Sequence, residues 1–116
     1  MLINDMLNWE IIEQAFKLYG SEGPFDHLVI DDFFDEKFAR KLSQEFPDVE
    51  SSIWHGYDNP IEVKFTNNVW NNFGPLTYQT FNYLNSEEFI YCLSKNLLSG
   101  KKLYPDNGLN GGGWHA

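Results

Sequence analysis

The side chains in this 116-residue chain best suited to metal chemistry are three histidines, His27, His55 and His115. None of them stands two residues before a carboxylate, and none belongs to a helical i, i+4 pair, the local arrangements that suggest metal ligation. His55 and Asp58 come closest, because a turn could bring both side chains to one ion. An Asp side chain that caps its own turn explains the Tyr-Asp-Asn-Pro sequence at 57–60 more simply. We therefore expect no metal site here.

A group of acidic residues between positions 31 and 36 could imitate a calcium-binding loop. It consists of Asp31, Asp32, Asp35 and Glu36. The group lacks the alternating oxygen ligands, the central glycine and the terminal glutamate of an EF-hand. Acidic residues at the start of a helix also interact favourably with the positive end of the helix dipole. The sequence therefore predicts the start of a helix at this point.

Other local catalytic motifs are missing from the sequence. The single cysteine, Cys92, lies in an apolar helical pattern and is best interpreted as a small core residue. There is no Gly-x-Ser-x-Gly motif, and the three glycines at 111–113 lack the spacing and the lysine of phosphate-binding loops. The 116 residues therefore carry no complete catalytic site of their own.

Charge and composition narrow the class of protein. Seventeen acidic and eight basic residues give a net charge of -9, which disfavours nucleic acid and anionic membranes as partners. The N-terminal residues have no basic leader and include Asp5, Glu10 and Glu13, so we expect neither a signal peptide nor a membrane span. A cytoplasmic location is the default expectation. The length and the 42% hydrophobic content fit one domain, 1–116.

Apolar periodicity and end signals predict four helices and three short strands. Asp35 is the expected N-cap of the second helix, Pro75 the first residue of the third, and Asn85 with Glu88 a capping pair for the fourth. The predicted helices span 5–19, 35–46, 75–84 and 85–99, and the predicted strands span 25–30, 52–56 and 61–66. The last two strands form a hairpin. The fold class is α+β, with helices packed on a small, mostly antiparallel sheet.

The C-terminal residues change in character, because three glycines lead directly into Trp114 and His115. Ordering a backbone residue costs about 1 to 2 kcal/mol of conformational entropy, so a free glycine run should be mobile. If this segment is ordered, we expect Trp114 to pack in a core or an interface. We also expect the backbone of the segment to pair as a strand.

Three segments together resemble the N-terminal part of a known enzyme family. They are residues 24–34 (PFDHLVIDDFF), residues 84–90 (LNSEEFI), and residues 103–106 (LYPD) followed by GGGWH at 111–115. In this order they resemble iron(II)- and 2-oxoglutarate-dependent dioxygenases of the prolyl-hydroxylase-like group, which includes versions from phages and marine bacteria. The resemblance runs from about Pro24 to His115.

The resemblance implies a hydroxylase with a double-stranded β-helix fold. This chain would form part of that fold. A His-x-Asp pair and a distant histidine would hold Fe(II), and a basic residue would hold 2-oxoglutarate. All of these residues would lie beyond Ala116, so the chain would hold no metal and be inactive alone. Trp114 and His115 would border the cofactor pocket or pack inside the barrel.

Two interpretations of the chain therefore remain. In the first it is the N-terminal portion of a larger dioxygenase-like domain, truncated before its iron ligands. In the second it is a non-catalytic protein-interaction module with an aromatic surface. An unfinished barrel would also expose strand edges, which predicts self-association.

Overall fold

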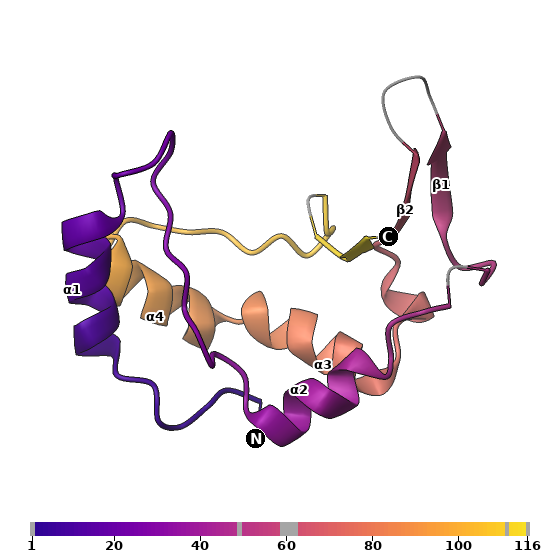
Figure 1. Ribbon diagram of the computed structural model, residues 1–116, viewed down its shortest axis with the longest axis horizontal. Coiled ribbons are helices and arrows are strands. Elements are labelled where there is room, and N and C mark those ends of the chain that lie inside the picture. The colour runs from indigo at the N-terminus through magenta and orange to yellow at the C-terminus, as the bar shows by residue number, and fades with distance from the viewer. Residues whose placement is uncertain (1, 49, 59–62, 111, 116) are drawn as a thin grey trace.

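The structure is a computed structural model that describes residues 2–48, 50–58, 63–110 and 112–115 (Figure 1), with residues 57, 58 and 63 described by their backbone only. Regular structure in these residues confirms the predicted α+β class. The helices are α1 (Trp9–Tyr19), α2 (Glu36–Ser43), α3 (Pro75–Leu84) and α4 (Glu87–Leu97), with a short 3-10 helix, η1 (Trp70–Asn72). The strands are β1 (His55–Asp58), β2 (Val63–Asn67) and β3 (Trp114–His115).

Side-chain caps define where the helices begin. Asp35 caps α2 as predicted, since its carboxylate accepts a hydrogen bond from the Phe38 N–H at 3.0 Å. Helix α1 begins four residues later than predicted because the Asn8 side chain caps it, accepting from the N–H groups of Glu10 and Ile11. Helix α3 has the predicted bounds and carries Pro75 in its first turn.

The predicted capping role of Asn85 is wrong. Ser86 caps α4, and its hydroxyl accepts a hydrogen bond from the Phe89 N–H. Asn85 instead closes α3, where its amide donates to the Phe81 carbonyl, and its side-chain oxygen accepts from the Asp106 N–H at 2.7 Å. Asn85 thereby ties the α3–α4 junction to the C-terminal segment.

The strand predicted at 25–30 does not form. Its β-branched residues favour an extended chain, but a strand needs a neighbour to complete its backbone hydrogen bonds. Within the described ranges, the backbone groups of Leu28, Val29 and Ile30 bond to no other residue. Nearby, an isolated bridge pairs Ile3 with Phe34, just before α2.

The sheet consists of the predicted hairpin and one further strand. β1 and β2 pair antiparallel, and Tyr57 and Asp58 extend β1 beyond its predicted end, while residues 59–62 lie outside the described part. β3 joins the other edge of β2 antiparallel, which gives the order β1-β2-β3. The described strands thus place the C-terminal residues beside the hairpin.

The helices pack mainly on one another, and the sheet stands at one end of the helical layer (Figure 1). Five apolar side chains are buried among the described residues, namely Leu2, Phe38, Leu42, Phe89 and Leu109. The radius of gyration is 16.2 Å, whereas a compact domain of this length would have about 13 Å. The fold is therefore open. No helix among the described residues has the length and apolarity required to cross a bilayer.

Candidate functional site

The two candidate site residues, Trp114 and His115, form β3. Trp114 pairs with Asn67 and His115 pairs with Thr66. The expectation that an ordered tail pairs as a strand is therefore confirmed. Because neighbouring side chains in a strand point to opposite faces of the sheet, the two residues have different surroundings.

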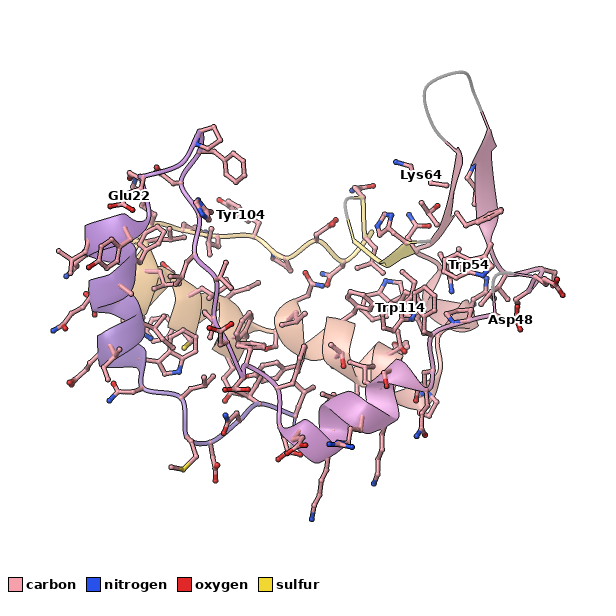
Figure 2. The ribbon with its side chains drawn as sticks, in the orientation of Figure 1. Glu22, Asp48, Trp54, Lys64, Tyr104 and Trp114 are labelled. Atoms are coloured by element: carbon pink, nitrogen blue, oxygen red, sulfur yellow. The ribbon has the colours of Figure 1, made fainter. Side chains whose placement is uncertain are left out.

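The Trp114 face of the sheet carries an aromatic cluster that joins sheet to helices. The Trp114 ring meets the Phe46 ring edge-on, with centroids 5.1 Å apart, and lies 6.5 Å from Phe81 of α3. Trp54 also contacts Phe46, at 5.5 Å, and Figure 2 shows both tryptophans where the sheet meets α2 and α3. The expected packing of Trp114 in a core is thus confirmed, and the ring also borders an apolar cavity of about 470 Å³ beside α2.

The opposite face of the sheet carries a row of polar side chains that the sequence did not reveal. His55 and His115 both pair with Thr66, from its two neighbouring strands. Directly opposed residues point to the same face, so the two imidazoles flank Thr66, with α-carbons about 10 Å apart over two strand spacings. Lys64 lies two residues before Thr66 on this same face. Sequence spacing alone could not show this juxtaposition.

This polar row does not fit an iron centre. Iron(II) oxygenases use two imidazoles and one carboxylate on one face. In the described ranges, no three His, Cys, Asp or Glu residues come together as a possible metal site. The side chain of Asp58, the weighed partner of His55, lies outside the described residues. Of the acidic group, Asp35 caps α2 and Glu36 begins it, as predicted, whereas Asp31 and Asp32 lie in a turn before the helix.

A close backbone contact holds β3 against β2. Gly113 has a φ of +110°, and a Cβ at this position would lie 2.5 Å from the carbonyl oxygen of Asn67. Only glycine allows this conformation and approach. The Asn67 side chain is 1% exposed, and its Nδ2 has no hydrogen-bond partner within the described part of the chain. The Oδ1 of the same side chain accepts from the Val69 N–H, so Nδ2 alone is the buried donor without an acceptor, which is costly.

Glu45 joins the end of α2 to the start of α3. Its carboxylate accepts hydrogen bonds from the N–H groups of Leu76 and Thr77 and from the Thr77 hydroxyl. Partial burial raises the pKa of Glu45, but these hydrogen bonds outweigh that effect, so the pKa lies below its ordinary value. Glu45 is therefore a charged helix cap.

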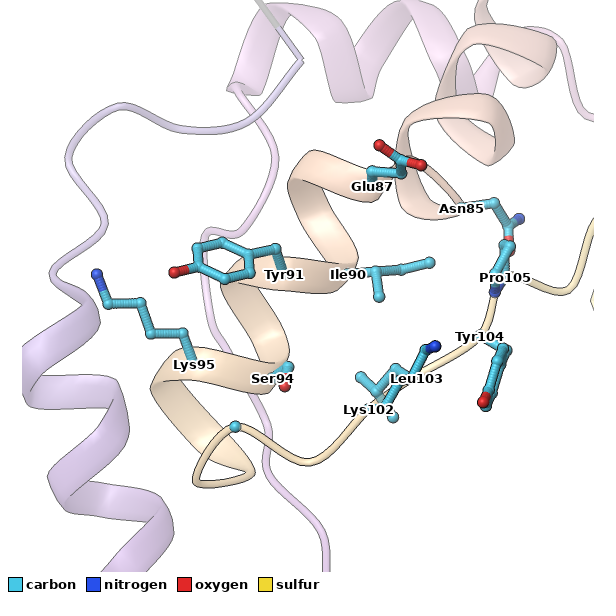
Figure 3. A pocket seen from close by; sticks show the side chains of 11 residues that line it. Asn85, Glu87, Ile90, Tyr91, Ser94, Lys95, Lys102, Leu103, Tyr104 and Pro105 are labelled. Atoms are coloured by element: carbon cyan, nitrogen blue, oxygen red, sulfur yellow. The ribbon is translucent and has the colours of Figure 1, made fainter.

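A groove of about 820 Å³ lies between α4 and the extended residues 102–105 (Figure 3). Ile90 and Tyr91 line it from α4, and Leu103 and Tyr104 line it from the extended segment. The Lys102 ammonium lies 5.2 Å from the centre of the Tyr104 ring. The groove is thus apolar with a cationic margin, and it is separate from the polar row on the sheet.

Comparison with known proteins identified no relative: no protein-family model, curated protein or solved structure matches this chain.

Proposed function

We propose that this chain supplies the helical support layer and the first sheet strands of an iron(II)- and 2-oxoglutarate-dependent oxygenase of the prolyl-hydroxylase-like group. The proposal follows from the order of the motifs between Pro24 and His115. In that family a Gly-Gly-Gly-x-His stretch enters an early strand of a double-stranded β-helix.

The observation that carries the proposal is the way in which Gly113 leads into β3. Gly113 approaches the Asn67 backbone more closely than any other residue type could, and the strand begins at the next residue. The Trp114 ring then fills the space between Phe46 and Phe81. A strand held against supporting helices in this way is what the first part of such a barrel requires.

Two features support a role as part of a larger structure. The buried Nδ2 of Asn67 lacks an acceptor among the described residues, which a further strand or segment could provide. The apolar cavity beside Trp114 and Leu42 would also be filled by further side chains. Both features lie at β3 or beside it.

The described residues do not provide the iron site, and no catalytic step is assigned to them. Fe(II) and 2-oxoglutarate would be held by residues outside this chain, and the complete protein would use them to hydroxylate a substrate. His115 and Trp114 would contribute packing at the border of the pocket.

Calorimetry under anaerobic conditions tests this division of roles. Titrating the chain with Fe(II) and 2-oxoglutarate together should give no stoichiometric heat of binding. A micromolar, stoichiometric signal that disappears in His55→Ala or in Asp58→Ala would contradict the proposal, because it would establish a local metal site. His27→Ala is the matched control, since His27 is exposed and lies outside the sheet.

A second candidate function, a protein-interaction module, is favoured by the exposure of large apolar side chains. Val29 and Tyr104 are each 76% exposed, and Phe25 is 69% exposed. Exposed apolar groups that lie together in a contiguous patch mark interaction sites on proteins. Binding of an exposed-hydrophobe dye by the isolated chain should be strong. Negligible dye binding would remove this candidate.

A further inference from the structure

Each of two extended segments of this chain contains three consecutive residues whose backbones make no hydrogen bonds within the described residues. We define the acidic segment as residues 26–32 and the basic segment as residues 101–104. Within the described part of the chain, neither the N–H nor the C=O groups of residues 28–30 and 102–104 have a partner. Unpaired extended backbone of this kind can accept another strand.

The acidic segment has the side chains of a strand. Leu28, Val29 and Ile30 are apolar and two of them are β-branched, which suits a pleated strand. All three line a groove with α1, but Leu28 and Ile30 are half-buried whereas Val29 is 76% exposed. This alternation leaves one apolar side chain free to contact a neighbour.

The basic segment lies beside the groove described above. Leu103 lines the groove opposite Ile90, while Tyr104 is 76% exposed. Figure 3 shows the two walls of the groove, which are α4 and residues 102–105. An arriving strand could hydrogen-bond to residues 102–104 and place apolar side chains in this groove.

The charges of the two segments are opposite. The acidic segment contains three exposed carboxylates, those of Asp26, Asp31 and Asp32. The basic segment begins with Lys101 and Lys102, and Lys95 lines the same groove. Three of the eight cationic residues of a chain with a net charge of -9 therefore gather here.

We infer that the occupant of the basic segment and its groove is the acidic segment of a second copy of this chain. The acidic segment combines extended backbone, the exposed apolar side chain of Val29 and the charge that complements the lysines. In a two-fold dimer each copy would offer both segments, so the same contact would form twice. This inference is independent of the proposed oxygenase function.

Charge exchange tests the contact directly. One variant carries Lys101→Glu and Lys102→Glu, and the other carries Asp26→Lys and Asp31→Lys, all at exposed positions. Sedimentation equilibrium of the unchanged chain at low salt should show a dimer. Each variant alone would place like charges opposite one another at both contacts, so its dimer dissociation constant should rise about tenfold or more.

Mixing the two variants in equal amounts should restore dimers of one copy of each. In that heterodimer one contact has its charges exchanged and the other keeps the original pairing, so both are complementary. The control variant Lys37→Glu with Lys41→Glu makes the same change in net charge on α2 and should dimerise like the unchanged chain. A monomeric unchanged chain, or a mixture no tighter than its components, would overturn the inference.

Discussion

The carboxylate of Glu45 accepts two hydrogen bonds from Thr77, one from its backbone N–H at 2.7 Å and one from its hydroxyl at 2.8 Å. Thr77 is fully buried in the first turn of α3. Residues 32 positions apart in the sequence are thereby joined. The positive end of the α3 dipole adds to this attraction.

Replacing Glu45 with Gln should destabilise the fold, since an amide is a weaker acceptor and carries no charge toward the helix dipole. We expect a loss of about 1 to 2 kcal/mol in the free energy of unfolding. Chemical denaturation, monitored by circular dichroism, measures this loss. Glu50→Gln, at an exposed position, is the control and should change stability by less than about 0.5 kcal/mol. Equal stability of the two variants would contradict the capping role.

The same carboxylate predicts a pH dependence. Its pKa is lower in the folded chain than the ordinary value of 4.5. A lowered carboxyl pKa stabilises the folded state above the unfolded-state value, and this contribution is lost as pH falls from about 4.5 through the folded-state pKa. Thermal unfolding should therefore give Glu45→Gln a lower melting temperature than the unchanged chain at pH 6, and this difference should narrow as the pH falls from 6 towards 3. A difference in melting temperature that stays constant over this pH range would contradict the lowered pKa of Glu45.

Gly113→Ala should disrupt the junction of β2 and β3. The added Cβ would meet the Asn67 carbonyl oxygen, and alanine is disfavoured at a φ of +110°. Gly100→Ala is the matched control, because Gly100 also has a positive φ, +79°, but has open space around it. The control should cost about 1 to 2 kcal/mol and Gly113→Ala clearly more. Similar melting curves for both would show that the close approach is unimportant.

Trp114 and His115 should differ in their effect on stability although they are adjacent. Trp114→Ala removes the ring that contacts Phe46 and Phe81 and should cost about 2 to 4 kcal/mol. His115→Ala changes an exposed side chain on the other face and should have little effect. Thermal unfolding of both variants provides the comparison. A large loss in His115→Ala, or none in Trp114→Ala, would contradict the assignment of faces.

The sequence predicted elements whose signals are local. Asp35 and Pro75 mark helix starts through their own side chains, and the structure confirms both. The predicted strand at 25–30 failed because pairing depends on a neighbour that no local pattern reveals. The predicted capping role of Asn85 failed as well, since its side-chain oxygen accepts a hydrogen bond from the N–H of Asp106, 21 residues away.

In the candidate site, too, the sequence predicted the local features but not those that depend on distant residues. The packing of Trp114 and the strand at 114–115 followed from the cost of ordering glycines, because order requires compensating contacts. The row of His55, Thr66 and His115 depends on strand register across the whole sheet, which residue spacing does not encode.

The most direct measurement of the oxygenase proposal is 2-oxoglutarate turnover by the polypeptide encoded by this gene with its coding sequence read past codon 116. We predict a His-x-Asp pair in a strand pattern after Ala116, and iron(II)-dependent formation of succinate from 2-oxoglutarate. Replacing that histidine with alanine should abolish the reaction, whereas His27→Ala should leave it unchanged. A coding sequence without such a pair, or a folded product with no succinate formation in the presence of Fe(II), would contradict the account.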